Sequence, residues 1–248
     1  MPKLRLDQIM VKQALTESRR QAENYIKLGQ VEVAGQVITD PAQVFSSTIQ
    51  LKLTTERYVS RAALKLASAA NVLQLNFKDK IILDVGSSTG GFTDYALRQG
   101  AAKVIAIDIG TDQLNHHLRA DHRVELHEKT DIRNFKTDQL IELVLIDLSF
   151  ISLRQILPGL RQLLPSSCRV VAMVKPQFEA TDNNLKEAGV IKNDHMRRAI
   201  LKDFEAWVSR YYVVIAKADS KIKGRKGNVE RFYLLNPLPA KTWSIKRA

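Results

Sequence analysis

The chain has 248 residues, and its 45% hydrophobic and 26% charged content is typical of folded globular proteins, which excludes wholesale disorder. Its apolar runs fall far short of the ~18 residues of a membrane span, no apolar signal core follows the N-terminus, and the one cysteine, Cys168, excludes an intrachain disulfide. We therefore expect a soluble, cytoplasmic protein without integral membrane association, and the net charge of +12 indicates a polyanion as its partner.

The first sixty residues predict a small α-plus-β unit. Apolar residues at helical spacing from Leu6 predict a first helix, and Ser18 opens a second one with the spacing of a capping box. Gly29 stands where a left-handed C-cap belongs. Residues 31–38 alternate around an Ala-Gly turn and predict a hairpin, and residues 44–53 add a further extended stretch.

Two short helices followed by a hairpin resemble the S4-type RNA-binding domain, from about Leu4 to Leu53. One departure is Ala34, which replaces the asparagine usual before the turn glycine. The resemblance implies RNA as partner, and five basic side chains could share one surface and contact phosphates. They are Lys3, Arg5, Arg19, Arg20 and Lys27. The alternative is that these side chains only form solvated helix faces.

Positive charge is concentrated at the end of the chain. From Lys217 onward the sequence holds 9 basic and 2 acidic side chains, a net charge of +7. We add three residues of this segment to the predicted RNA-binding set. They are Lys223, Arg225 and Lys226.

A polar linker at residues 54–57 divides the chain into an S4-like unit, residues 1–57, and a second domain, residues 58–248. The second domain opens with a helix over about 61–70, and helices begin near Phe92, Asp112, Leu153 and Asp194. Strands are expected at Ile81–Val85, Lys103–Ile107, Arg123–His127, Leu143–Ile146, Arg169–Val174, Tyr211–Lys217 and Val229–Leu235. This alternation predicts a seven-stranded, doubly wound, Rossmann-like α/β sheet whose last two strands can pair antiparallel.

A glycine-rich turn follows the first strand of this sheet, where a ligand can approach the backbone closely. The turn fits neither a P-loop nor a dinucleotide fingerprint. Acidic residues close the next strands at Asp108 and Asp131, placed for ribose hydroxyls and an adenine amino group. This set suits a nucleoside without phosphates, namely S-adenosylmethionine, and Asp84 is compatible with the sulfonium charge. The predicted cofactor residues are Asp84, Gly86, Ser88, Thr89, Gly90, Gly91, Phe92, Asp108, Ile109, Asp131 and Ile132.

Four charged residues in distinctive local sequences complete the pattern. Lys65 precedes the first strand of the sheet, Asp147 and Lys175 end the fourth and fifth strands, and Glu230 opens the last strand. Ligands of open α/β sheets bind at the carboxyl ends of the strands, so Asp147 and Lys175 converge there with the glycine turn. Alternatives for single residues are a surface lysine at 65 and a strand-end salt bridge between 147 and 175.

With these motifs, the whole chain resembles the haemolysin-type (TlyA-like) ribosomal RNA 2′-O-methyltransferases, which join an S4 domain to an FtsJ-like methyltransferase. The resemblance is carried by residues 84–94, 147–153, 175–179 and 227–230. The sequence departs from the family at Ala62-Ala63, where two glycines are common, at Thr111-Asp112, where an aromatic-glycine pair is usual, and at the proline-like position of Lys221.

The resemblance implies transfer of a methyl group from S-adenosylmethionine to a ribose 2′-hydroxyl of cytidine in ribosomal RNA, within ribosomal subunits. It places Lys65, Asp147, Lys175 and Glu230 on the Lys-Asp-Lys-Glu catalytic tetrad, with Lys175 as the general base. A free lysine ammonium holds its proton at pH 7, so neighbouring positive charge or burial must favour the neutral form. We expect Asp147 and Glu230 to orient the lysines and the hydroxyl.

Other interpretations remain open at this stage. The chain could be an RNA-binding assembly factor without turnover, or a membrane-active protein of the kind the haemolysin name suggests. His116, His117 and His122 lie in a charged stretch that predicts a solvated helix and loop, so we assign no metal site. The polar segment 176–193 is a candidate loop over the substrate. The oligomeric state stays open, with a monomer as the expectation.

Overall fold

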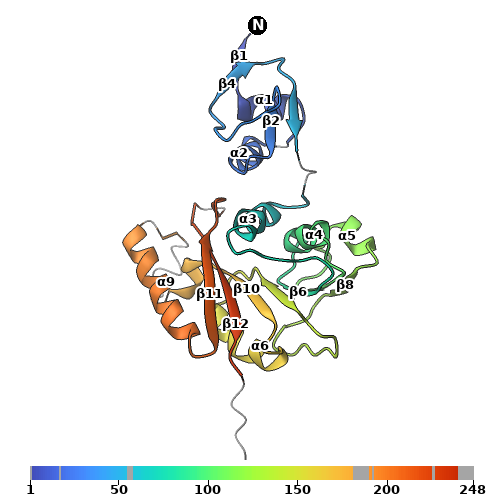
Figure 1. Ribbon diagram of the computed structural model, residues 1–248, viewed down its shortest axis with the longest axis vertical. Helices are drawn as coiled ribbons and strands as arrows, with labels where there is room; N and C mark the ends of the chain where they lie inside the picture. The colour runs from blue at the N-terminus through green and yellow to red at the C-terminus, as the bar shows by residue number, and fades with distance from the viewer. Residues whose placement is uncertain are drawn as a thin grey trace, which may run out of the picture.

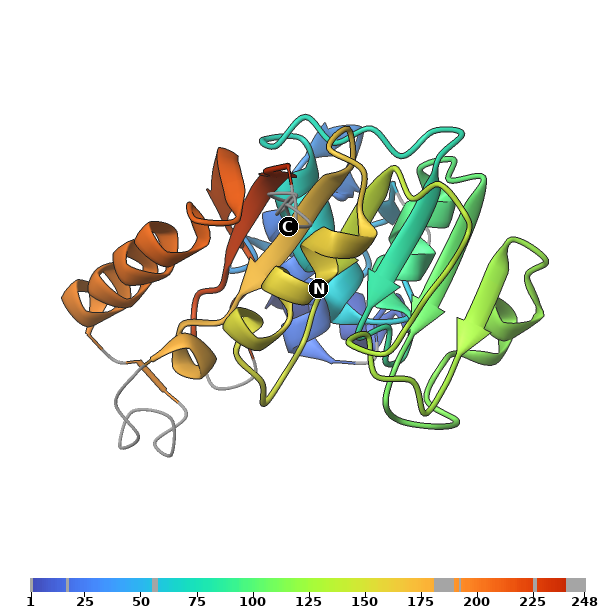
Figure 2. The ribbon, with the colours of Figure 1, turned by 90° about the horizontal axis from the view of Figure 1, so that it is seen from below.

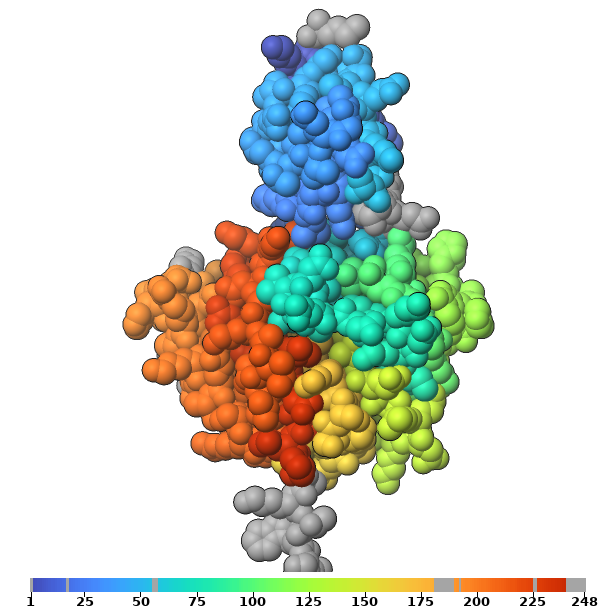
Figure 3. All heavy atoms as spheres, in the orientation of Figure 1, coloured from blue at the N-terminus to red at the C-terminus, as the bar shows by residue number. Residues whose placement is uncertain are grey.

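The computed structural model describes residues 2–16, 18–54, 58–180, 190–191, 193–224 and 227–239. A small N-terminal unit lies at one end of the long axis, and a larger α/β unit forms the rest of the molecule (Figure 1). In the space-filling view the small unit rests on the larger one over α3 and the C-terminal strands (Figure 3).

The N-terminal unit contains two helices and two small sheets. Its elements are β1 (Lys3–Arg5), α1 (Leu6–Lys12), α2 (Arg19–Lys27), β2 (Val31–Val33), β3 (Gln36–Val37), β4 (Val44–Ser46) and β5 (Leu51–Leu53). The Ser18 hydroxyl caps α2 by accepting a hydrogen bond from the Gln21 amide at 3.3 Å. Gly29 has a φ of +69° at the end of the helix. The predicted cap, C-terminal glycine and hairpin are thus confirmed.

The hairpin turn keeps its geometry despite the alanine that departs from the S4 pattern. Ala34 and Gly35 have φ angles of +50° and +78°, the pair of positive values that a type I′ turn requires. Residues 44–53, expected as one extended stretch, form two strands in different sheets, because the chain turns at Ile49, whose amide donates to the Ser46 carbonyl.

The larger unit is built on a seven-stranded mixed sheet, as predicted. Its strands are β6 (Ile81–Val85), β7 (Lys103–Ile107), β8 (Val124–His127), β9 (Leu143–Ile146), β10 (Arg169–Val174), β11 (Tyr212–Asp219) and β12 (Arg231–Pro237), in the order β11-β12-β10-β9-β6-β7-β8. Six strands run in the same direction, and β12 lies between β10 and β11 and runs antiparallel to both. Strand order reverses between β6 and β9, where a doubly wound sheet opens a ligand crevice.

Helices cover both faces of this sheet (Figure 2). They are α3 (Arg61–Ala70), α4 (Gly91–Arg98), α5 (His116–Ala120), the 3-10 helix η1 (Leu153–Gln155), α6 (Leu157–Leu163), α7 (Pro176–Glu179) and α9 (Asp194–Val208). Alternate strand residues feed two hydrophobic cores: Ile82 packs with the α3–α4 side, whereas Leu83 packs with the α6–α9 side. This division follows from the period-2 side-chain alternation of strands.

The helix expected near Asp112 begins later, at His116. Asp112 has a φ of +55°, which is left-handed and cannot open an α-helix. The Asn115 side chain instead accepts a hydrogen bond from the His117 amide at 3.0 Å and caps the helix. Asp112 occupies the position where the FtsJ-like pattern has glycine, and its positive φ explains that preference.

Candidate active site

The glycine loop after β6 crosses the carboxyl end of β9 at very close range. Gly86 has a φ of +83°, and a Cβ there would lie 2.9 Å from the Asp147 carbonyl oxygen. Its amide donates to the Ile107 carbonyl at 2.9 Å, which holds the loop over β7. Glycine at this position therefore lets the loop and the start of the Asp147 segment lie in contact.

A cavity of about 500 Å³ opens at this crossing, between the ends of β6, β7 and β9. Six of the predicted cofactor residues line it. They are Gly86, Ser88, Asp108, Ile109, Asp131 and Ile132. Other parts of the lining come from Gln113, Thr130, Arg133 and the segment Asp147–Ile151. The cavity thus combines loop amides, acidic side chains and apolar walls.

Asp108 braces the glycine loop while it lines this cavity. Its Oδ2 accepts a hydrogen bond from the Ser88 amide at 2.8 Å, and its Oδ1 accepts one from the Gly110 amide at 2.7 Å. Each carboxylate oxygen has a second lone-pair direction, so Asp108 can also accept hydrogen bonds from a ligand.

Asp131 shares its carboxylate with a neighbouring arginine. The Arg133 guanidinium donates from Nε at 3.0 Å and from Nη2 at 2.5 Å, and these hydrogen bonds lower the pKa of Asp131. Both side chains line the cavity. A ligand amino group would therefore meet a carboxylate that is already ion-paired.

Two predicted cofactor residues support the loop from behind and line neither cavity described here. Asp84 is fully buried, accepts a hydrogen bond from the Thr93 hydroxyl at 2.6 Å, and thereby fixes the first turn of α4. Burial raises the pKa of Asp84 to about 7. Gly90 has a φ of +93°, and a Cβ there would collide with Leu118 and Leu114.

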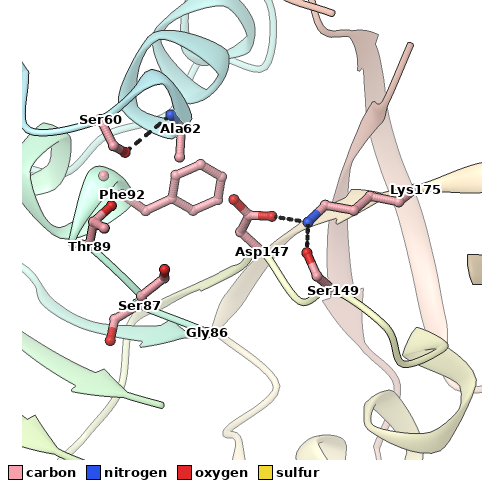
Figure 4. A pocket seen from close by; sticks show the side chains of 11 residues that line it. Ser60, Ala62, Gly86, Ser87, Thr89, Phe92, Asp147, Ser149 and Lys175 are labelled. Carbon is pink, nitrogen blue, oxygen red and sulfur yellow. Dashed lines mark hydrogen bonds and ion pairs between the residues drawn. The ribbon is translucent and has the colours of Figure 1, made fainter. Parts of the chain in front are cut away.

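A smaller cavity of about 130 Å³ adjoins the first (Figure 4). The predicted residues Thr89, Gly91 and Phe92 line it together with Asp147 and Lys175. Four residues line both cavities: Gly86, Ser88, Asp147 and Ser149. The two cavities therefore meet at the glycine loop and the end of β9.

The four predicted tetrad residues form two ion pairs. Lys175 Nζ lies 2.6 Å from Asp147 Oδ1 and donates a hydrogen bond to the Ser149 hydroxyl at 2.6 Å; both contacts are visible in Figure 4. Lys65 Nζ lies 3.0 Å from Glu230 Oε1, with side chains only 13% and 3% exposed. The first pair lines the smaller cavity and the second is buried outside its lining.

Glycine makes room for Glu230. A Cβ at Gly224 would collide with Glu230 Oε1, so a side chain there would push this carboxylate oxygen out of its position. The Gly224 amide donates to the Asn228 carbonyl at 2.8 Å and closes that turn.

The helix that carries Lys65 packs tightly on the helix that follows the glycine loop. A Cβ at Gly91 would lie 2.7 Å from the Ala62 Cβ and 2.9 Å from the Ala63 amide nitrogen. Alanines 62 and 63 replace glycines of the family pattern, so close approach of α3 and α4 depends here on Gly91. Ser60 and Ala62 line the smaller cavity and were not among the predicted residues.

Ser149 and Phe150 also belong to the site and were not singled out from the sequence. Phe150 is 92% exposed, has a φ of +67°, lines the larger cavity and lies with its ring centroid 5.4 Å from that of Phe178. Its place three residues after Asp147, at the end of a predicted strand, is the sequence signal that could have identified it.

Several basic residues predicted to bind RNA have partners within the protein. Arg5 and Arg19 both donate to the buried carboxylate of Asp7, and Lys27 pairs with Glu23 at 3.6 Å. Arg20 donates to the Gly224 carbonyl at 2.6 Å and so links α2 to the turn before Glu230. Lys3 and Lys223 are exposed, and Arg225 and Lys226 lie outside the described residues.

Three further features bear on the alternatives. The His116 and His117 rings lie tilted to each other with centroids 3.9 Å apart, and across the described ranges no three His, Cys, Asp or Glu side chains gather into a metal-binding group. In the same ranges, no helix has both the length and the apolar character needed to cross a membrane. The candidate substrate loop, 176–193, begins with α7, but residues 181–189 and 192 lie outside the described residues.

The mixed seven-stranded sheet, the glycine loop at the reversal of strand order and the acidic residue after β7 define a Rossmann-like methyltransferase. An FtsJ-like methyltransferase family model matches residues 58–236, and an S4 domain model matches residues 4–47. The chain belongs to the FtsJ-like methyltransferase family, in the TlyA-like branch that carries an N-terminal S4 domain.

Relatives of similar length support this assignment. The chain is 34% identical over 249 residues to the 16S/23S rRNA (cytidine-2′-O)-methyltransferase TlyA of Mycobacterium tuberculosis, covering 98% of this chain and 93% of that protein. It is 41% identical over 190 residues to the 23S rRNA (cytidine-2′-O)-methyltransferase TlyA of Campylobacter jejuni, covering 75% and 73%. A solved structure from Streptococcus thermophilus, described as a candidate hemolysin, superposes with a TM-score of 0.70 at 38% identity, covering 97% of this chain and 90% of that one.

Proposed function

We propose that this enzyme transfers the methyl group of S-adenosylmethionine to a ribose 2′-hydroxyl of cytidine in ribosomal RNA, acting on ribosomal subunits in the cytoplasm. The observation that carries the proposal is the position of Lys175, hydrogen-bonded to Ser149 and ion-paired to Asp147 where the two cavities meet. We infer cytidine and ribosomal RNA as the substrate from the names of the two TlyA relatives.

The larger cavity fits a nucleoside cofactor. Asp108 stands where it can accept ribose hydroxyls, and Ile109 and Ile132 offer apolar walls for an adenine ring. In the adjoining smaller cavity, Ser87 Oγ is buried without a hydrogen-bond partner among the described residues, so a ligand can satisfy it. S-adenosylmethionine, when bound, supplies an electrophilic methyl group on a cationic sulfur.

Lys175 and Asp147 act on the substrate hydroxyl in this proposal. A ribose 2′-hydroxyl is a weak nucleophile, so it must be placed in line and must lose its proton during transfer. Lys175 Nζ holds the hydroxyl and, in its neutral form, accepts the proton. Asp147 Oδ1, 2.6 Å from Lys175 Nζ, orients the lysine. The buried Lys65–Glu230 ion pair joins α3 to the residue that directly precedes β12. In this proposal it holds α3, whose Ala62 lines the smaller cavity, in place.

Removing the Asp108 carboxylate is expected to weaken binding of S-adenosylmethionine. Asp108→Ala deletes the acceptor for ribose hydroxyls and for the Ser88 and Gly110 amides, so affinity should fall about tenfold to a hundredfold, the range of one or two lost charge-assisted hydrogen bonds. Calorimetry measures this. RNA affinity should not change, and Asp194→Ala, at an exposed acid on α9, serves as the control. Unchanged cofactor affinity in the Asp108 variant would remove Asp108 from the site.

Binding to ribosomal RNA should depend steeply on salt. If six or more phosphates are contacted, affinity falls by about three orders of magnitude between ~50 and ~200 mM salt, because counterions are released on binding. Lys3→Ala and Lys223→Ala, at exposed lysines, should each lower the slope of log affinity against log salt by about 1. Filter binding over a salt series provides the slopes, and a flat response contradicts a phosphate-contacting surface.

Labelled methyl transfer to isolated ribosomal subunits tests the proposed function. The expected product is a 2′-O-methylcytidine, mapped by nuclease digestion and mass spectrometry in ribosomal RNA from cells with and without the gene. Small and large subunits are assayed separately, because one relative is named for 16S and 23S rRNA and the other for 23S rRNA. Binding to subunits without any transfer would instead show an assembly factor that keeps the fold without turnover.

A further inference from the structure

We infer that Glu179 is a positioning residue of the methyl-transfer site, whose carboxylate ties the loop after β9 to the helix after β10 and thereby holds Ser149 and Phe150 beside Lys175. The inference rests on the proposed function, since it concerns the same reaction. It assigns a role to a residue that touches neither of the two cavities described above.

Glu179 is almost completely buried, at 3% exposure, and both of its carboxylate oxygens are engaged. Oε1 accepts a hydrogen bond from the Leu153 amide at 2.7 Å, and Oε2 accepts one from the Ser152 hydroxyl at 2.6 Å. Arg154 Nε lies 3.6 Å from Oε2. Burying a carboxylate is costly unless it is hydrogen-bonded in this way, and burial raises the pKa of Glu179.

The hydrogen bonds of Glu179 are the last of three sets of contacts between residues 175–179 and residues 147–153. Lys175 is the N-cap of α7, and Glu179 is the last residue of that helix. From this helix segment, Lys175 binds Asp147 and Ser149, the Phe178 ring contacts Phe150, and Glu179 binds Ser152 and Leu153. The loop 147–153 is thus held at its start and in its middle beside the reacting lysine, and at its end by Glu179.

Phe150 shows why the last link matters. A phenylalanine with a φ of +67° is held in a conformation that L-residues rarely adopt, and at 92% exposure its own burial does not compensate. Such a conformation persists only when its surroundings impose it. Glu179 supplies that constraint, because its carboxylate binds the Ser152 hydroxyl and the Leu153 amide, two and three residues after Phe150.

The test compares single-turnover methyl transfer to ribosomal subunits, at saturating cofactor, by Glu179→Ala, Ser149→Ala and the double variant. Misplacing reacting groups by about 1 Å costs on the order of a hundredfold in rate, and we expect a loss of that size in the single-turnover rate of Glu179→Ala at saturating cofactor. Glu179→Gln keeps an acceptor for the Leu153 amide and should recover most of the rate. Because Glu179 acts through the loop, adding Ser149→Ala to Glu179→Ala should lower the rate less than it does in the wild type.

Glu205→Ala is the matched control. Glu205, on α9, accepts hydrogen bonds from Lys217 on β11 and from Tyr233 on β12, and it lines neither cavity. The effect of Glu205→Ala on the transfer rate should therefore multiply with that of Ser149→Ala. A wild-type rate in Glu179→Ala, or multiplicative effects of Glu179→Ala and Ser149→Ala, would overturn the inference and leave the proposed function intact. Absence of transfer by the wild-type enzyme would instead refute the function. If Glu179→Ala does not fold, Ser152→Ala, which removes the hydrogen bond to Glu179 Oε2, carries the same comparison.

Discussion

Replacing Lys175 with alanine is expected to reduce methyl transfer by about three orders of magnitude, within the range that a positioned general base contributes. The side chain is lost from the junction of the two cavities, where it contacts Asp147 and Ser149. The fold should persist at a lower unfolding free energy, since Lys175 makes no side-chain hydrogen bond to α7 but its loss leaves Asp147, 17% exposed, without its ion-pair partner. S-adenosylmethionine should still bind, because the loop amides and Asp108 are untouched. Rate and cofactor affinity are measured on the same preparation.

Lys175→Arg separates proton acceptance from positioning. A guanidinium keeps the positive charge and can hold a hydroxyl, but it does not lose its proton near neutral pH. The arginine variant should therefore be nearly as inactive as the alanine variant, and the wild-type rate should rise with pH while chemistry limits turnover. Substantial activity of Lys175→Arg with the wild-type pH profile would show that Lys175 only positions the hydroxyl, and that the proton leaves to water or to Asp147.

The second large effect is expected at the buried Lys65–Glu230 pair. Glu230→Ala leaves the Lys65 ammonium, whose side chain is only 13% exposed, without its 3.0 Å partner. Breaking a buried ion pair costs about 3 kcal/mol or more of unfolding free energy. Methyl transfer should fall at least as far as with Lys175→Ala, because both the fold around α3 and the proposed tetrad are disturbed. Denaturant unfolding and the transfer assay give the two numbers.

A double replacement distinguishes stability from catalysis at this pair. Lys65→Met with Glu230→Leu removes both charges and keeps similar volume, an exchange that is often neutral or stabilising for a buried pair. The unfolding free energy should return to within about 1 kcal/mol of wild type, whereas methyl transfer should remain lost. Recovery of activity in the double variant would show that the pair serves only the fold.

The sheet and the positions of the chemical groups were predictable because both depend on short-range pattern. Apolar runs of four to eight residues between polar turns marked the strands. A charged residue directly after a parallel strand lies at the ligand crevice of the sheet, independently of the conformation of the following loop. Asp147 and Lys175 were placed in this way, and they lie together in the structure.

Contacts that join distant segments were not predictable from the sequence. Arg20 was expected on an RNA-facing surface, yet it donates to the carbonyl of Gly224, 204 residues away. Exposure and charge do not reveal such a partner, because a guanidinium satisfies a carbonyl and a phosphate equally well. At Asp112 the family's glycine was the available sign of the left-handed backbone, and the charged stretch alone suggested a helix start instead.

The place of β12 in the sheet has a consequence for biosynthesis. This last strand lies between β10 and β11, and Glu230 directly precedes it. While the chain is being made, the N-terminal unit can fold early from local contacts, but the sheet keeps an open gap beside β10 until residues 231–237 leave the ribosome. A nascent or prematurely terminated chain can therefore have a folded first unit before the sheet that carries the candidate site is complete.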